Sequence, residues 1–133
     1  MTVVVGYTPT PPGRAALVAA IGQARKESEL LVVVNSGRGE SLDDPTYARP
    51  EDLEWARTTA EEAGVEITVR QEMRGRDAAD ELLDVLEEVD ASLCVIGIRK
   101  RTAVGKMLLG SNANRVLMNA PCPVLTVRPR DDA

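Results

Sequence analysis

The side chains best suited to chemistry lie in one stretch near the C-terminal end of the chain. Two glycines, Gly97 and Gly110, bracket a loop with four positive charges, on Arg99, Lys100, Arg101 and Lys106. Because glycine has no side chain, a phosphate or ribose could approach the backbone closely at either position. Ser111 and Asn112 follow at the expected start of a helix, where free amide N–H groups and the helix dipole favour negative charge. This stretch predicts a site for a small anionic ligand.

The composition excludes several other classes of site. The chain has 133 residues and no histidine, which removes imidazole bases, histidine metal sites and nucleophile–histidine pairs. Cys94 and Cys122 lack the spacing of zinc or thioredoxin-type centres, so we expect two buried, reduced thiols and no metal site. The net charge of −5 argues against general nucleic-acid binding. Because we find neither a signal peptide nor a membrane span, we expect a cytoplasmic protein that binds neither nucleic acid nor membranes.

Hydrophobic patterns predict five strands that alternate with four helices. Continuous apolar runs indicate buried strands at 3–5, 30–34, 93–98 and 124–127, and period-two alternation indicates an edge strand at 65–69. Apolar residues at helical spacing predict helices at about 12–26, 50–63, 77–90 and 111–120, and we expect the acidic outer face of the third helix to be solvated. We expect residues 36–49 to be a mobile loop and residues 129–133 a C-terminal tail.

The alternation of strands and helices predicts one domain over residues 1–133. Its fold class is α/β: a doubly wound, five-stranded parallel sheet of order 3-2-1-4-5 with helices on both faces. Ligands in such a sheet bind at the carboxyl ends of the strands where the order reverses, here between the first and fourth strands. The loop after the first strand contains three prolines in residues 8–12 and therefore few amide donors. The Gly105-Lys106 pair lacks the flanking residues of a Walker A loop, so the anion site is left to the fourth-strand loop.

Each candidate residue also has a simpler explanation. Gly97 could merely turn the chain, Ser111 could merely cap the helix, and the basic residues could be solvated. Their shared position at the expected reversal of strand order favours ligand binding over these explanations.

The whole chain resembles the universal stress protein family, most specifically in VIGIRKRTAVGKMLLGSNA and APCPVLTVR near the C-terminal end. Nucleotide-binding members carry the signature G-x2-G-x9-G-[ST]. Gly97, Gly110 and Ser111 match it in register, whereas Lys100 replaces the second glycine. The Lys100 side chain could crowd the phosphates or could pair with them. The family also usually has an Asp shortly after the first strand, where this chain has Thr8.

The resemblance implies a Rossmann-like stress-response protein that binds an adenine nucleotide (ATP, ADP, AMP or cyclic AMP) at the loops after the first and fourth strands. The binding residues that it implies are Thr8, Pro9, Thr10, Val34, Gly97, Arg99, Lys100, Gly110, Ser111 and Asn112, with Val34 near the adenine. Mg²⁺ would be required only with ATP. We expect no enzyme activity beyond weak ATP hydrolysis, because no general base is placed at the expected phosphates.

The resemblance also implies a homodimer. The last strand would pair with its own copy through Val124, Leu125, Thr126 and Val127, because pairing satisfies an otherwise exposed edge. Prolines at both ends of this strand could equally protect the edge of a monomer. Two other functions stay open. Lys100 and Thr8 favour a nucleotide-independent interaction module, and a small hydrolase or phosphotransferase is disfavoured by the missing histidine.

Overall fold

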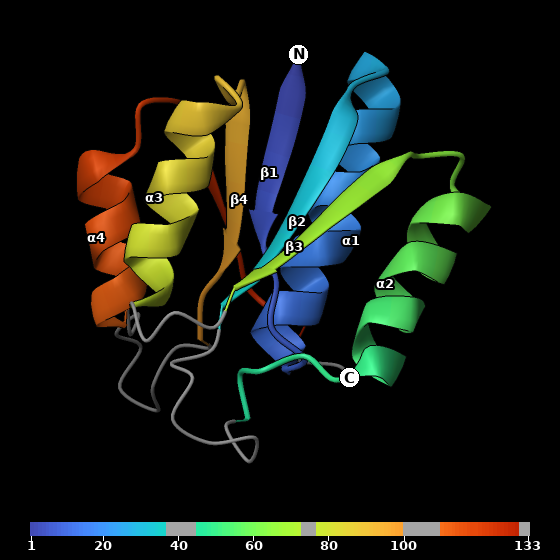
Figure 1. The fold of residues 1–133 in the computed structure, drawn as a ribbon, viewed down its shortest axis with the longest axis horizontal. Helices are drawn as coiled ribbons and strands as arrows, with labels where there is room; N and C mark the ends of the chain where they lie inside the picture. The colour runs from blue at the N-terminus through green and yellow to red at the C-terminus, as the bar shows by residue number, and fades with distance from the viewer. Residues whose placement is uncertain (37–44, 73–76, 100–109, 131–133) are drawn as a thin grey trace.

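The chain forms a three-layer α/β fold in which one parallel sheet separates two pairs of helices (Figure 1). The computed structural model describes residues 1–36, 45–72, 77–99 and 110–130. The elements in chain order are β1 (Thr2–Gly6), α1 (Pro11–Glu27), β2 (Leu30–Ser36), α2 (Pro50–Glu62), β3 (Ile67–Glu72), α3 (Ala78–Glu88), β4 (Leu93–Gly97), α4 (Ser111–Asn119) and β5 (Val124–Val127). The strand order is β3-β2-β1-β4-β5 and all four pairings are parallel, which confirms the predicted fold.

The two faces of the sheet bury two separate cores. On the face of α1 and α2, Val3 and Val5 pack with apolar residues of both helices, whereas Val4 points to the core under α3 and α4. These three valines of β1 are at most 1% exposed, as a continuous β-branched run in a central strand predicts. β1 is therefore buried on both faces, and its carboxyl end adjoins the candidate site.

The third strand begins two residues later than its alternation predicts. Gly64 ends α2 with a φ of 75° and donates its N–H to the carbonyl of Glu61, and Val65 donates to the carbonyl of Ala60. These two bonds are those of a Schellman motif. The backbone N–H of Val65 is therefore bonded to the end of α2 and not to a neighbouring strand, although the Val65 side chain is buried. Strand pairing therefore starts only at Ile67.

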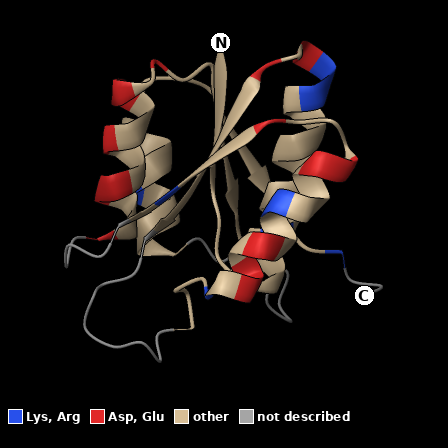
Figure 2. Ribbon diagram, turned by 45° about the vertical axis from the view of Figure 1, so that its right-hand side comes forward, with Lys and Arg blue, Asp and Glu red and all other residues tan. Residues whose placement is uncertain are grey.

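Two expectations about side chains need correction. Acidic residues lie along the helices on both sides of the sheet (Figure 2), yet Glu81 of α3 is only 3% exposed, so the acidic run is not wholly solvated. Cys94 is buried as expected, and burial, with a smaller effect of Cys122, raises the pKa of its thiol to about 12. Cys122 is only partly buried, and burial also raises the pKa of its thiol.

Other expectations fall outside the part of the chain that can be described. The predicted loop at 36–49 and tail at 129–133 lie partly in residues 37–44 and 131–133, and both stay predictions. Within the described ranges, no helix is long and apolar enough to cross a membrane.

Candidate functional site at the reversal of strand order

A cavity of about 190 Å³ lies at the carboxyl ends of β1, β2 and β4, where the strand order reverses. The N-terminal halves of α1, α3 and α4 complete its walls. The described residues that line it are Gly6, Tyr7, Thr8, Pro12, Gly13, Val34, Thr46, Ala78, Ala79, Leu82, Ile96, Gly97, Asn112, Ala113 and Val116. The lining is mostly apolar with a few polar groups, which is typical of sites for small organic ligands.

Four of the ten predicted binding residues line this cavity: Thr8, Val34, Gly97 and Asn112. The others described do not belong to its lining, although they are adjacent to it in the chain: Pro9, Thr10, Arg99, Gly110 and Ser111. Lys100, on which the departure from the family signature rests, lies outside the described residues. The structure thus brings together residues of β1, β2, β4 and α4 that the sequence separates widely.

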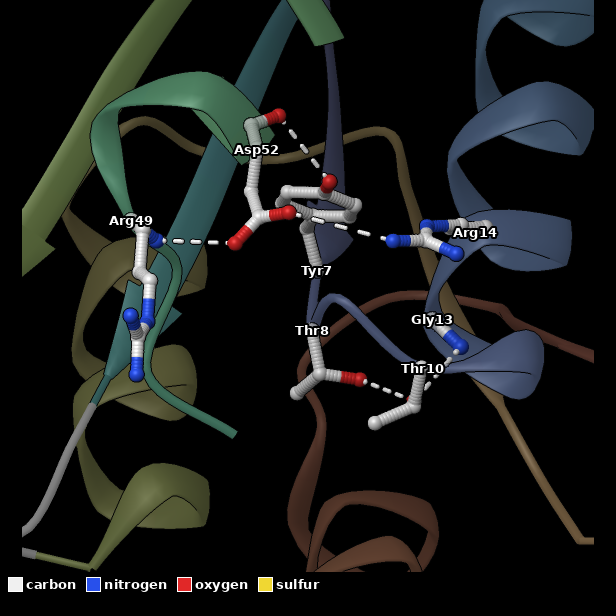
Figure 3. A network of polar contacts seen from close by, with 7 residues as sticks. All are labelled: Tyr7, Thr8, Thr10, Gly13, Arg14, Arg49 and Asp52. Carbon is white, nitrogen blue, oxygen red and sulfur yellow. Dashed lines mark hydrogen bonds and ion pairs between the residues drawn. The ribbon is translucent and has the colours of Figure 1, made fainter. Parts of the chain in front are cut away.

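The first turn of α1 offers a ligand no backbone donor. Pro11 and Pro12 occupy the first two helical positions and have no N–H. The N–H of Gly13 donates to the Oγ1 of Thr10, the N-cap residue, at 3.3 Å. The Thr10 hydroxyl also pairs with the hydroxyl of Thr8 at 2.7 Å (Figure 3). An anion at this end of the cavity would have to be bound by other groups.

The first turn of α4 supplies such groups. Gly110 is the N-cap residue and has no side chain to satisfy the first amides, and the helical ladder starts with the N–H of Asn114 on the carbonyl of Gly110. Ser111 is the first helical residue, so the simpler explanation that it caps the helix is wrong. The backbone N–H groups of Ser111, Asn112 and Ala113 precede the ladder and lie where the helix dipole favours negative charge.

Ion pairs hold α4 against α3. Arg115 of α4 lies 3.4 Å from the carboxylate of Asp77, just before α3, and also pairs with Asp80 in its first turn. All three side chains are substantially exposed, so the pairs add little stability. They join the middle of α4 to the start of α3.

The glycines at the cavity have different roles from those expected. A Cβ on Gly97 would lie 2.1 Å from the carbonyl oxygen of Pro12, so the space that its missing side chain leaves is occupied by α1. A Cβ on Gly13 would likewise lie 2.1 Å from the carbonyl oxygen of Thr8. Both glycines let α1 pack closely on the strand ends. A Cβ on Gly110 would meet nothing within 4 Å among the described residues, so no described atom requires glycine there.

A polar network anchors the end of β1 to α2 (Figure 3). The buried Tyr7 donates its hydroxyl hydrogen to the carbonyl oxygen of Asp52 at 3.0 Å. The Asp52 carboxylate accepts the N–H of Arg49 at 2.9 Å and lies 3.8 Å from the guanidinium of Arg14. Trp55 stacks on the Tyr7 ring, with 6.2 Å between centroids. These contacts hold the residue before Thr8 and therefore the β1 side of the cavity.

The phenol of Tyr7 should make stability depend on alkaline pH. Burial, and then the Asp52 carboxylate, raise the pKa of Tyr7, against an opposing effect of Arg14. A raised folded pKa gives a contribution that is complete below the unfolded pKa and is lost as pH rises through the folded pKa. We expect Tyr7→Phe to cost about 1 kcal/mol at neutral pH. We also expect its unfolding free energy to fall less steeply than that of the wild type above about pH 10. Urea unfolding at several alkaline pH values measures both, and equal pH slopes would contradict the assignment.

The sequence analysis did not predict that residues of α3 and of the segment before α2 would line the cavity. Ala78 and Ala79 could have been found, because a helix that follows a parallel strand starts at that strand's carboxyl end. No local pattern marks Thr46, which reaches the cavity only through contacts distant in sequence.

Comparisons with known proteins agree with this architecture. The family model for the universal stress protein family matches residues 1–128. A universal stress protein of Mycolicibacterium smegmatis is 42% identical over 127 residues, covering 96% of this chain and 97% of the relative. The structure of the Archaeoglobus fulgidus universal stress protein in complex with dAMP has a TM-score of 0.71 and 26% identity, covering 96% of this chain and 97% of that chain. A universal stress protein in complex with cAMP has a TM-score of 0.74 and 26% identity, covering 98% of both chains.

The match therefore extends over residues 1–128 in sequence and over 96% to 98% of the chain in the two structures. The chain belongs to the universal stress protein family.

Proposed function

We propose that this protein is a cytoplasmic, homodimeric stress-response protein that binds an adenine nucleotide at the cavity without efficient turnover. The observation that carries the proposal is the position of the cavity, at the reversal of strand order and beside the uncapped first turn of α4. The two similar proteins solved with dAMP and with cAMP support the same class of ligand.

We place the base and the phosphate of the nucleotide at different parts of the cavity. Val34 lies on β2 and Gly97 on β4, on either side of β1, so about 10 Å separates them at the usual strand spacing. Val34 and Leu82 suit an aromatic base, and the amides of Asn112 and Ala113 suit a phosphate. The volume of about 190 Å³ is below the roughly 300 Å³ of typical small-molecule sites. A nucleoside would therefore occupy the cavity, with its phosphates outside it along the start of α4.

We propose binding without turnover because of the side chains described at the cavity. Among the described residues of its lining, none is acidic or basic. A general base or a carboxylate that holds Mg²⁺ would have to come from elsewhere, so we include Mg²⁺ only as a companion of bound ATP.

Nucleotide binding is tested by thermal unfolding and calorimetric titration with AMP, dAMP, cAMP, ADP and ATP. A nucleotide at about 100 times its dissociation constant should stabilise the fold by roughly 2.7 kcal/mol. Asn112→Ala should weaken binding about tenfold, because it removes a polar group that lines the cavity.

The matched control is Asn119→Ala, at the other end of α4, where the side chain only donates to the carbonyl of Arg115. Its affinity should equal that of the wild type. Absence of binding by every nucleotide at millimolar concentration would reject the proposal and favour the nucleotide-independent interaction module. The occupied Thr8 and Thr10 hydroxyls and the proline-rich start of α1 would then explain the loss of the ligand.

The homodimer is proposed through β5, which lies at one edge of the sheet. Val124, Leu125 and Val127 are partly exposed there, and Thr126 is exposed. Thr126→Glu should convert a dimer to a monomer, because two copies of the charge would face each other across the two-fold axis. Thr68→Glu, at an exposed position of the opposite edge strand β3, is the control and should leave the mass unchanged. Light scattering measures the mass, and a monomeric wild type at micromolar concentration would rule out this dimer.

A further inference from the structure

Asn35, near the end of β2, has every hydrogen-bonding position of its side-chain amide occupied. It is 0% exposed. Its Nδ2 donates to the carbonyl oxygens of Tyr7 at 2.9 Å and of Thr46 at 2.8 Å. Its Oδ1 accepts the N–H of Ala48 at 2.9 Å and the Nε2 of Gln71 at 2.9 Å. Because carbonyls only accept and the Ala48 N–H only donates, these partners determine the orientation of the amide.

Gln71 of β3 closes the same arrangement from the neighbouring strand. Its Nε2 also donates to the carbonyl oxygen of Ala48 at 2.7 Å. Both backbone groups of Ala48, which is 1% exposed, are thereby held by the two side-chain amides. We call Asn35 and Gln71 the amide pair. It ties the segment before α2 to the ends of β1, β2 and β3.

Two of the residues that Asn35 holds line the cavity. Tyr7 lies at the end of β1 and Thr46 on the segment before α2. A single side chain therefore sets the separation of these two walls, at the Val34 end of the cavity. The amide pair itself does not belong to the described lining, so it acts on a ligand only through the backbone that it positions.

We propose that the amide pair consists of positioning residues that hold Thr46 against the base end of the cavity and so determine which nucleobase is accepted. The inference rests on the proposed nucleotide-binding function. Adenine and guanine carry different groups at two ring positions, and guanine has an additional 2-amino group. If the cavity wall at Thr46 cannot move, it excludes this group by steric overlap. If the wall is loosened, the group can be accommodated. Selectivity thus depends on how rigidly Thr46 is held.

The test compares the dissociation constants of AMP and GMP by calorimetry in the wild type and in Gln71→Met. Gln71 is only partly buried, and methionine has a similar length but no donor. We expect the wild type to bind AMP more tightly than GMP. In the variant the ratio of the GMP to the AMP dissociation constant should fall about tenfold, mainly because GMP binds more tightly. Ser92→Ala is the control. It removes a side-chain hydrogen bond to Glu29 (2.7 Å) at the opposite end of the sheet and should leave the preference unchanged.

A second measurement needs no ligand. Hydrogen exchange of the Ala48 amide reports on the amide pair, with the Tyr7 amide, bonded to the Val34 carbonyl at 2.8 Å, as internal reference. We expect Ala48 to be protected in the wild type and to exchange about tenfold faster in Gln71→Met, whereas Tyr7 should not change.

The outcomes separate the two proposals. A wild type that binds neither AMP nor GMP overturns the role of the amide pair, and the proposed function is overturned as well only if dAMP, cAMP, ADP and ATP also fail to bind. A wild type that binds AMP but does not prefer it to GMP, or a Gln71→Met protein with the wild-type preference, overturns the role of the amide pair alone. Fast exchange of Ala48 in the wild type overturns it as well, whether or not the variant folds.

Discussion

Gly97→Ala is expected to destabilise the protein by about 3 kcal/mol and to abolish the proposed nucleotide binding. The new methyl group would lie 2.1 Å from the carbonyl oxygen and 2.4 Å from the carbonyl carbon of Pro12. Neither atom can yield alone, because both belong to the backbone of the first turn of α1. Relief of the clash requires that turn to move away from β4. The movement would displace Pro12 and Gly13, which line the cavity. Urea unfolding and a nucleotide titration of the refolded variant measure the two effects.

Two other glycines serve as controls for the loss of backbone freedom. Gly110→Ala should stay within about 0.5 kcal/mol of the wild type, because a Cβ there meets no described atom within 4 Å and φ is −67°. Gly22→Ala, at an exposed position of α1, should stabilise the protein by roughly 0.5 to 1 kcal/mol. A Gly97→Ala protein as stable as these two would show that α1 does not pack on β4 as described.

Asn35→Leu is expected to destabilise the protein by about 4 kcal/mol. Leucine branches at the same position but is larger, so the loss combines that of the hydrogen bonds with overpacking at a fully buried site. The carbonyl oxygens of Tyr7 and Thr46 and the N–H of Ala48 would lose a partner in a place that water hardly reaches. Buried groups without a partner cost more than the bonds themselves contribute. Chemical unfolding measures the change.

The control for this substitution is Asn119→Leu, which removes a single bond to the carbonyl of Arg115 on the exposed side of α4. It should change stability by less than about 0.5 kcal/mol. If the two variants were equally stable, the Asn35 amide would not be the buried tie between β1, β2 and the segment before α2.

The fold could be predicted because its determinants are local. The three valines of β1 are buried by covering helices on both faces, and such a strand requires a continuous apolar run. Gly64 marks the end of α2 because its φ of 75° favours glycine. The predicted start of β3 at Val65 is wrong, because the sequence pattern of a buried β-branched residue is the same whether it begins a strand or follows a helix in a Schellman motif.

The candidate site could be predicted only in part. Gly97 and Asn112 were predicted to lie there because strand ends and helix starts at the reversal of strand order follow from topology, whereas Thr8 and Val34 were implied only by the resemblance to the family. Thr46 and Asn35 were not found. Asn35 bonds a residue 28 positions away on β1, and Gln71 bonds Asn35 across 36 positions. No periodicity marks such pairs.

The sequence by itself determined the family and the order of the strands, because periodicity and glycine spacing reflect the backbone around each residue. Only the tertiary structure decided what each residue of the candidate site does. Gly97 fits the family signature, yet its missing side chain makes room for Pro12 of α1. The resemblance implies Thr10 as a binding residue, and the structure adds that its hydroxyl caps α1. The physical reason is that a close approach or a buried hydrogen bond depends on atoms from both partners, which only packing brings together.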